Sequence, residues 1–101
     1  MGVTAENVAK KFSISRKEQD EFALSSQKKV RIALKNNKFD DELIKINYKG
    51  NIFDKDEYPR VNLKLSDLEK LNTVFQENGT VTPGNSSGIN DGAAALLLTN
   101  L

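Results

Sequence analysis

The chain has 101 residues, 38% hydrophobic and 29% charged, which is the size and composition of one small globular domain with a modest core. Fifteen Lys and Arg against fourteen Asp and Glu give a net charge of +1, so no long-range field favours nucleic acid or an anionic membrane. Cysteine and histidine are both absent, which excludes disulfides, thiolate or imidazole metal ligands, and cysteine or histidine catalysis by these residues alone.

The first predicted element is a short helix near the N-terminus. Thr4 is expected to be its N-cap, because a threonine hydroxyl can accept a hydrogen bond from a free N–H group of the first turn. Val8 and Phe12 follow four residues apart, so a helix would place both on one face. Ser13 or Ile14 is expected to end it.

A second, longer helix is predicted from Ser15 to about Lys35. Ser15 and Glu18 match the S-x-x-E capping box, in which each side chain satisfies a backbone donor of the other residue. Apolar residues then recur at roughly helical spacing, which predicts an apolar stripe opposite a charged side. The stripe comprises Phe22, Ala23, Val30, Ala33 and Leu34.

A hairpin is predicted next. Residues 43–48 mix β-branched and aromatic side chains with partial alternation, as a half-buried strand does. Residues 49–51 are a turn candidate, and Ile52 and Phe53 could begin a short partner strand.

A third helix and a turn are predicted after the hairpin. Ser66 and Glu69 repeat the capping-box pattern, which indicates a short helix through about Leu71. Asn78 and Gly79 then form a dipeptide typical of a tight turn.

The apolar run Ala93–Leu98 differs from everything before it. It is too short to span a membrane, and its lack of alternation favours a strand that is covered on both faces. The rest of the chain offers one good strand and one poor one, so the other strands of such a sheet are expected in sequence outside these residues. A buried helix is the alternative, because Ala and Leu are also good helix formers.

Three stretches together resemble one known family. They are MGVTAENVA with SRKEQDEFA (residues 1–9 and 15–23), KFDDE (38–42) and GTVTPGNSSGINDGAAA (79–95). In order and spacing they resemble the thiolase family, in particular its acetyl-CoA C-acetyltransferases, also called acetoacetyl-CoA thiolases. The resemblance implies an α+β chain with a partial thiolase fold. Residues 1–78 would be part of the CoA-binding loop domain, and residues 79–101 the return segment and core strand of the N-terminal thiolase domain.

The chemistry of that family is the Claisen condensation of two acetyl-CoA molecules, or its reverse, through an acyl-cysteine intermediate. A cysteine attacks the thioester, a histidine lowers the pKa of that cysteine, a second cysteine moves the proton at the α-carbon, and an oxyanion hole holds the enolate. The resemblance implies that the nucleophile lies upstream of Met1, and that the histidine and second cysteine lie downstream of Leu101.

Part of a CoA site is what the resemblance assigns to this segment. Met1 would lie beside the acyl group, Arg60 near the adenine nucleotide, and Val74 and Phe75 along the pantetheine arm. Ser87, followed by Gly88, would donate a hydrogen bond to a pantetheine amide. Judged without the resemblance, Met1 would be an ordinary start residue, Arg60 a surface residue, Phe75 core and Ser87 a turn residue.

Two positions depart from the family pattern. Asp67 stands where some relatives have a small polar residue near the nucleotide, which weakens the expected phosphate electrostatics there. Pro83 replaces a common alanine, although proline also occurs in relatives.

The expected function is therefore to contribute part of the acyl-CoA site of an acetyl-CoA C-acetyltransferase. CoA or acetyl-CoA would be the substrate, with no metal and no covalently bound cofactor, and the partners would be the rest of the thiolase chain in a homo-oligomeric parent, with no nucleic acid and no membrane. A cytoplasmic setting is expected, or a mitochondrial one in a eukaryote. The alternatives are a non-catalytic CoA-binding or interaction module from a truncated gene, and a segment with no function of its own.

Overall fold

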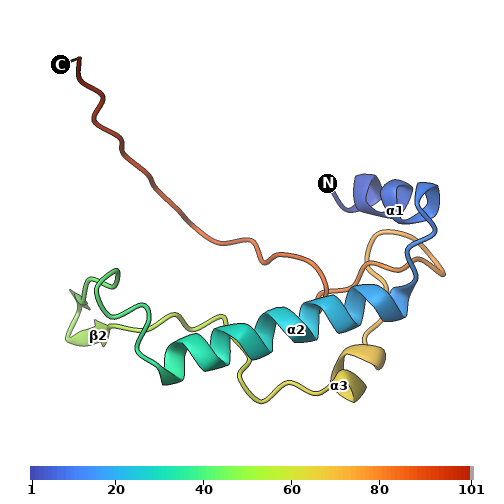
Figure 1. Cartoon of the computed structure of the whole chain (residues 1–101), viewed down its shortest axis with the longest axis horizontal. Coiled ribbons are helices and arrows are strands. Elements are labelled where there is room, and N and C mark those ends of the chain that lie inside the picture. The colour runs from blue at the N-terminus through green and yellow to red at the C-terminus, as the bar shows by residue number, and fades with distance from the viewer. Residues whose placement is uncertain (101) are drawn as a thin grey trace.

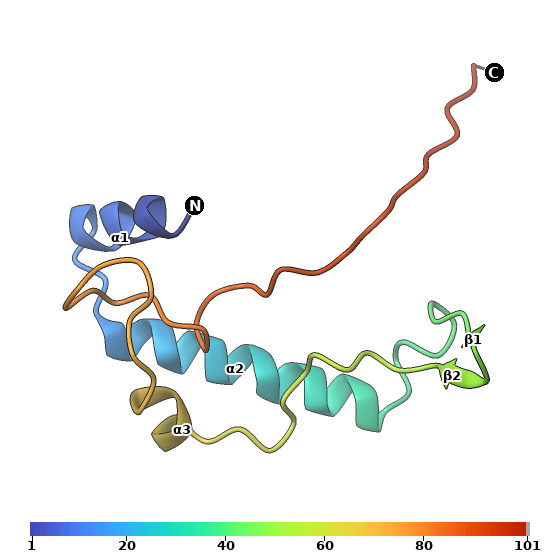
Figure 2. The same cartoon turned by 180° about the vertical axis from the view of Figure 1, so that it is seen from behind.

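A computed structural model describes residues 1–100 of the chain (Figure 1). Within that range it contains three helices, α1 (Gly2–Lys11), α2 (Arg16–Lys35) and α3 (Leu65–Glu69), and one hairpin of β1 (Ile46–Tyr48) and β2 (Asn51–Phe53). The long helix α2 is the axis of the molecule, with α1 and α3 near its N-terminal end and the hairpin beyond its C-terminal end (Figures 1 and 2). This arrangement is α+β, as expected.

Helix α1 begins earlier than predicted. Its N-cap is Met1 and the Ala5 N–H already donates to the Met1 carbonyl at 3.1 Å, so Thr4 lies inside the first turn and the expected Thr4 cap is wrong. The end of α1 is a Schellman motif, in which the Ser13 and Ile14 N–H groups donate back to the carbonyls of residues 10 and 9. Ser13 takes a φ of 54°, the left-handed conformation that such an ending requires.

Helix α2 has the predicted ends. The Ser15 hydroxyl accepts from the Glu18 N–H at 3.2 Å, and the Ser15 N–H donates to the Glu18 carboxylate at 2.7 Å, so the capping box is confirmed. The Ser15 hydroxyl and the Ser15 N–H each donate to the Glu18 carboxylate at 2.7 Å and stabilise its charged form, so the pKa of Glu18 lies below its ordinary value. The helix ends at Lys35, again through a Schellman motif, with Asn37 at a φ of 54°.

The apolar stripe predicted for α2 is only partly correct. Phe22 is 79% exposed, and Ala23, Val30, Ala33 and Leu34 are only half-buried. The residues that α2 does bury are Leu24 and the charged Asp20. Helical spacing predicts which residues share a face of α2, but it does not predict which face another element will cover. Here α3 and the loop after it contact the side of α2 that carries Asp20.

The predicted hairpin is present, with shorter strands. Ile46 pairs with Phe53 and Tyr48 with Asn51 in antiparallel register, leaving a two-residue loop of Lys49 and Gly50. Both loop residues have positive φ, 50° and 82°, the conformation of the mirror-image turns that match strand twist. Glycine adopts this conformation without steric cost, which explains its place in the turn.

Helix α3 forms at the predicted place with a different cap. Ser66 lies inside the helix, and the N-cap is Lys64, whose backbone N–H donates to the Asp67 carboxylate at 3.0 Å. The expected Ser66 cap is therefore wrong, because the chain enters the helix two residues earlier and Asp67, not Glu69, becomes the third helical residue. The predicted turn at Asn78 and Gly79 is confirmed by a 3.1 Å bond from the Gly79 N–H to the Gln76 carbonyl.

The core is small and unusually polar. Among the described residues the buried apolar side chains are Ala9, Leu24, Leu68 and Val81, and the buried polar ones are Glu6, Asp20 and Thr82. A fully buried leucine contributes about 1.5 to 3 kcal/mol, so this apolar set stabilises the fold only modestly. Buried carboxylates must therefore have good hydrogen-bond partners for the fold to persist.

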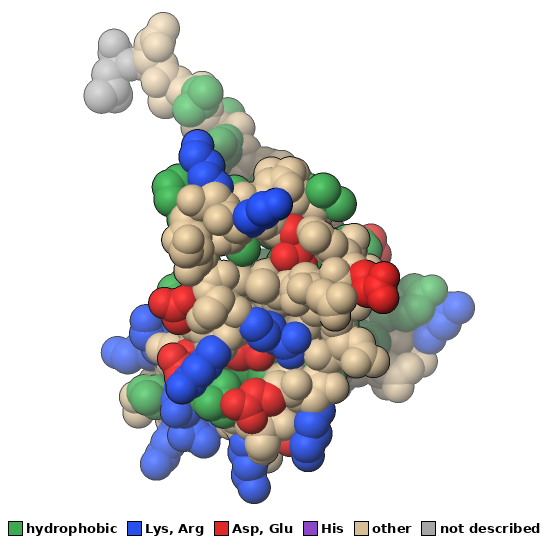
Figure 3. Space-filling view, turned by 90° about the vertical axis from the view of Figure 1, so that its right-hand side faces the viewer, with side chains coloured by type: hydrophobic (Ala, Val, Ile, Leu, Met, Phe, Trp, Pro, Cys, Tyr) green, Lys and Arg blue, Asp and Glu red, His purple; other side chains and the backbone are tan. Residues whose placement is uncertain are grey.

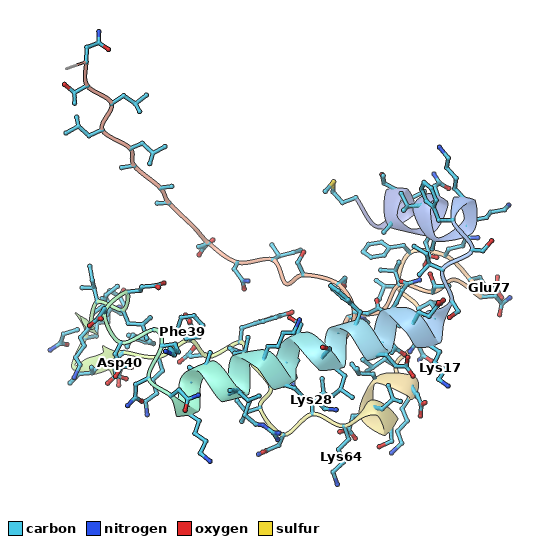
Figure 4. All side chains as sticks on the ribbon, viewed as in Figure 1. Lys17, Lys28, Phe39, Asp40, Lys64 and Glu77 are labelled. Atoms are coloured by element: carbon cyan, nitrogen blue, oxygen red, sulfur yellow. The ribbon has the colours of Figure 1, made fainter. Side chains whose placement is uncertain are left out.

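The apolar run at the C-terminal end is neither a strand nor a helix. Residues 89–100 have no regular secondary structure, and Leu96, Leu97 and Leu98 are at least 90% exposed. From residue 91 onward the segment leaves the body of the molecule as an extended trace (Figure 1), and its side chains stand clear of the other elements (Figure 4). The expected buried strand is thus not formed, because the hairpin is remote and no other described strand can pair with it.

The rest of the surface is mixed in charge. The face in Figure 3 carries both signs of charge among neutral groups, with Lys and Arg side chains gathered toward its lower part. Lys28 on α2 is exposed and directed to solvent (Figure 4). In the part of the chain that the structure describes, no helix combines the length and the apolar character needed to cross a bilayer.

Replacing Leu97 by Lys should increase the fraction of soluble monomer, because an exposed apolar strand with unpaired edges invites pairing between copies. Since Leu97 is 95% exposed, the melting temperature should stay within about 4 °C of the unmodified chain. Light scattering coupled to size-exclusion chromatography and thermal unfolding measure the two effects. A large loss of thermal stability without gain in monomer would contradict the exposed placement.

Candidate functional site

A cleft of about 290 Å³ lies between α2, the segment before α3, α3 itself and the loop of residues 80–88. We call it the Arg60 cleft. It is lined by Gln27, Tyr58, Arg60, Leu63, Asp67, Leu68, Leu71, Pro83, Gly84 and Ser86. Its residues come from four separate parts of the chain, so it exists only when these parts are folded together.

The polar groups of the Arg60 cleft are few. The Arg60 backbone N–H donates to the Gln27 side-chain oxygen at 2.8 Å, which fixes the Arg60 backbone to α2 while the residue remains exposed. Asp67 is the carboxylate of the cleft and is engaged with the Lys64 backbone. A guanidinium beside an aromatic ring and leucine side chains suits a ligand with a planar or anionic group and a linear apolar part.

Two glycines allow the walls of the cleft to approach closely. A Cβ atom at Gly84 would overlap the side chains of Leu68 and Leu71, and one at Gly88 would lie 2.7 Å from the Tyr58 ring. A larger residue at Gly84 would have to displace the buried Leu68 side chain or move the 80–88 loop away from α3, whereas the exposed Tyr58 side chain could turn aside for one at Gly88. Gly84 therefore allows the close approach of the loop to α3.

Behind the cleft, Asp20 joins its two walls. Its side chain is 1% exposed, and its two oxygens accept from Arg16 Nε at 2.7 Å and from Asn85 Nδ2 at 2.9 Å. Arg16 also donates from Nη2 to the Leu68 and Leu71 carbonyls at 2.7 and 3.0 Å. One buried carboxylate on α2 thus connects the end of α3 with the 80–88 loop.

Glu6 fastens the same loop to α1. Its carboxylate accepts from the Thr80 and Val81 N–H groups at 2.8 to 2.9 Å and from the Thr80 hydroxyl at 2.9 Å. Burial alone would raise the pKa of Glu6, but the hydrogen bonds from Val81 and Thr80 to the charged form outweigh it and lower the pKa. Glu6 is therefore a charged group that the fold holds in place.

The residues predicted from the sequence separate into two groups. Arg60 lines the cleft, Gly88 lies against Tyr58, and Ser87 is exposed next to the lining residue Ser86. The second group lies at α1. It contains Met1, which is fully exposed, Phe75, whose ring lies against Gly2, and Val74, whose N–H donates to the Val81 carbonyl at 3.1 Å.

Sequence reasoning missed several residues that build the site. Tyr58 and Gln27 line the cleft, and Glu6, Asp20 and Asn85 hold the 80–88 loop. Each is a common surface residue type, so composition alone gives no signal. The partial signals were the position of Asp20, one turn after Arg16, and of Asn85 in a loop rich in Gly and Ser.

The described residues contain no group of three or more acidic side chains that could hold a metal ion, and the sequence has no Cys or His. The chemistry available at the cleft is therefore recognition through hydrogen bonds, one guanidinium and apolar contact.

A family model described as "Thiolase, N-terminal domain" matches residues 1–101. The chain is 51% identical to an acetyl-CoA acetyltransferase of Rhizobium meliloti and 47% identical to one of Escherichia coli, in each case over 97% of this chain and 26% of the relative. The chain therefore spans about a quarter of the length of these curated relatives.

The chain is also similar to solved thiolase structures. The human mitochondrial 3-ketoacyl-CoA thiolase in complex with CoA aligns with a TM-score of 0.80 at 44% identity, over 85% of this chain and 22% of the other. The acetyl-CoA acetyltransferase of Syntrophomonas wolfei aligns with a TM-score of 0.84 at 39% identity, over 90% and 24%. The arrangement of helices, hairpin and loop is thus a partial thiolase fold.

Replacing Glu6 by Gln should lower the free energy of unfolding at pH 7 by about 1 to 3 kcal/mol, because buried N–H groups lose a charged acceptor. The lowered pKa means that this stabilisation is fully present above the ordinary glutamate pKa of about 4.3 and is lost as the pH falls through the folded value. The gap between the two proteins should therefore narrow below about pH 4.

Urea unfolding from pH 7 to pH 3 measures this gap. Glu18 is present in both proteins, so its own lowered pKa cancels in the difference. Replacement of the exposed Glu42 by Gln is the matched control and should leave stability nearly unchanged. A gap that is constant across the pH range would show that Glu6 does not act through its charge.

Proposed function

The chain belongs to the thiolase family, and we propose that it supplies part of the acyl-CoA site of an acetyl-CoA C-acetyltransferase. In this assignment the segment binds the CoA portion of the substrate during condensation of two acetyl-CoA molecules or thiolysis of acetoacetyl-CoA. Residues 1–78 belong to the CoA-binding loop domain, and residues 79–101 return to the core of the N-terminal domain.

The observation that carries the assignment is the Arg60 cleft. It combines an exposed guanidinium, the Tyr58 ring and three leucine side chains, which suits a nucleotide joined to a linear arm. The likeness to a thiolase solved in complex with CoA supports the same ligand class. Arg60 would contact the nucleotide, and Ser87 with Gly88 would meet the pantetheine arm at the mouth of the cleft.

Met1, Val74 and Phe75 would form the end of the site nearer the acyl group. Phe75 is half-exposed against the start of α1, so one face of its ring is available to an apolar arm. A long, linear ligand such as CoA would run from the cleft to this group.

The groups that make and break bonds would lie in sequence outside these 101 residues. The nucleophilic cysteine would precede Met1, and the histidine and second cysteine would follow Leu101. The segment contains no cysteine or histidine, so it lacks the residue types that form the acyl-enzyme and move the α-carbon proton in the chemistry of this family.

The same absence favours one second candidate, a CoA-binding module that acts without turnover. Binding by the chain alone at physiological concentrations of CoA would distinguish it from a segment that works only within a complete thiolase.

We expect the chain to bind CoA weakly, because half of a site must order its ligand without the opposite wall. Replacing Arg60 by Ala should weaken that binding at least tenfold, since the guanidinium is the cation of the cleft. Replacing Arg31 by Ala removes the same group from an exposed position on α2 and is the matched control. Titration followed by amide NMR shifts at Tyr58, Arg60 and Gly88 measures both.

Two results would count against this assignment. Equal affinity of the Arg60 and Arg31 variants would exclude the cleft as the site, and shifts confined to residues remote from it would do the same. Sub-micromolar affinity would instead promote the binding module.

The purified chain should show no thiolysis of acetoacetyl-CoA in the presence of CoA above the uncatalysed rate, because it contains none of the cysteines or histidines on which the chemistry of the family depends. Loss of the acetoacetyl-CoA absorbance measures the rate. Turnover that follows the chain through successive purification steps would overturn this account of the chemistry.

A further inference from the structure

The walls of the Arg60 cleft are held by a chain of hydrogen bonds that does not itself face the cleft. One wall is α3, through Leu68 and Leu71, and the other is the 80–88 loop, through Gly84. Asp20 and Asn85 are not among the residues that line it, yet both walls connect to them.

The connection to α3 is made by Arg16. Its Nη2 donates to the Leu68 carbonyl in the last turn of α3, which also accepts from the Leu71 N–H at 3.0 Å, and to the Leu71 carbonyl two residues beyond the helix. Its Nε donates to Asp20, so the position of the guanidinium, and with it the end of α3, is set by the buried carboxylate.

The connection to the loop is made by Asn85. Its Nδ2 donates to Asp20 and to the Thr80 carbonyl, and its Oδ1 accepts from the Thr82 N–H at 2.8 Å. Every polar atom of the Asn85 side chain is thereby used to shape the loop that leads to Ser86 and Ser87. The loop cannot shift without breaking the contact with Asp20.

We propose that Arg16, Asp20 and Asn85 form a positioning relay that fixes the separation of the two cleft walls, with Asp20 as its central positioning residue for the acyl-CoA ligand. The identity of the ligand, an acyl-CoA, rests on the proposed function. The claim that Asp20 fixes the distance between the two walls does not. Asp20 contacts neither the cleft nor its contents and acts through Arg16 and Asn85.

The chemistry of Asp20 makes the relay specific. Two donors face it, so both positions need an acceptor oxygen. Asparagine offers one acceptor oxygen and one NH2 group that only donates, and Asp20→Asn therefore leaves one wall without its partner. The buried mismatch is relieved only if a wall moves.

The test uses the 101-residue chain and has a readout that needs no ligand. Gly84 lies against the Leu68 and Leu71 side chains, so nuclear Overhauser effects between the Gly84 Hα protons and those methyl groups report wall separation. A CoA titration of the same samples reports the consequence for binding.

Asp20→Asn should lose or strongly weaken the Gly84 contacts and bind CoA at least tenfold more weakly, with α1 and α2 still folded. Asn85→Ala should also weaken the Gly84 contacts and the CoA affinity, although it keeps the Arg16–Asp20 pair. This second variant provides the test if Asp20→Asn does not fold. The double variant Asp20→Asn with Asn85→Asp exchanges donor and acceptor, and should recover part of the Gly84 contacts.

Two controls separate positioning from stability and charge. Ala9→Gly destabilises α1 without touching the relay and should keep the Gly84 contacts and the CoA affinity. Asp41→Asn removes the same charge from an exposed site and should change neither.

The relay is wrong if folded Asp20→Asn and Asn85→Ala keep the Gly84 contacts, or if Ala9→Gly loses them equally. It is also wrong as a device for ligand positioning if the contacts are lost while CoA affinity stays within about twofold. Absence of CoA binding at the cleft in the unmodified chain would overturn the ligand assigned to the relay but not a site that the rest of a thiolase completes, while the Gly84 contacts still decide the wall separation.

Discussion

The buried carboxylate of Asp20 is the interaction on which the arrangement of this chain depends. It lies on α2, and its two oxygens reach, directly or through Arg16, the end of α3 and the 80–88 loop. A buried ion pair is a poor source of net stability, because desolvation offsets the attraction, but removing one partner is costly. Asp20 therefore specifies which segments come together more than it stabilises the result.

Glu6 has the same role at the other end of the 80–88 loop. It accepts backbone N–H groups from a segment more than 70 residues away in the sequence, as a side-chain substitute for a strand partner. Carboxylates hold the segments together because the apolar core is small. Among the described residues, Leu68 is the largest fully buried apolar side chain. Directional bonds compensate for the area that hydrophobic packing does not cover.

The small apolar core contrasts with the large apolar surface that the C-terminal segment leaves exposed. Leu96, Leu97 and Leu98 leave more apolar surface in water than the core removes in its own leucines. The chain spans about a quarter of the length of the curated relatives that it matches, and none of its described elements covers this apolar segment. The cleft, by contrast, needs only segments that this chain contains, which is why it forms here.

The sequence by itself determined the local elements. The Ser15 capping box, the end of α2 at Lys35 and the Lys49–Gly50 turn depend on residues within a few positions of one another, so short-range chemistry was enough. The family resemblance likewise depended on contiguous stretches, and the comparisons confirmed it. The prediction that Arg60 contacts the nucleotide came only from that resemblance and stays a prediction, although Arg60 does line the cleft.

Only the tertiary structure decided which faces are buried and which segments meet. Helical spacing marked Phe22 as part of an apolar face, yet the chain buries Asp20 instead, because the partner on that side is a polar loop and the end of α3. The run Ala93–Leu98 is apolar enough for a central strand, but a strand requires neighbours that these residues do not supply. Asn85 and Glu6 gain their roles from partners 65 and 74 to 75 positions away, and no local pattern encodes a hydrogen bond across that separation.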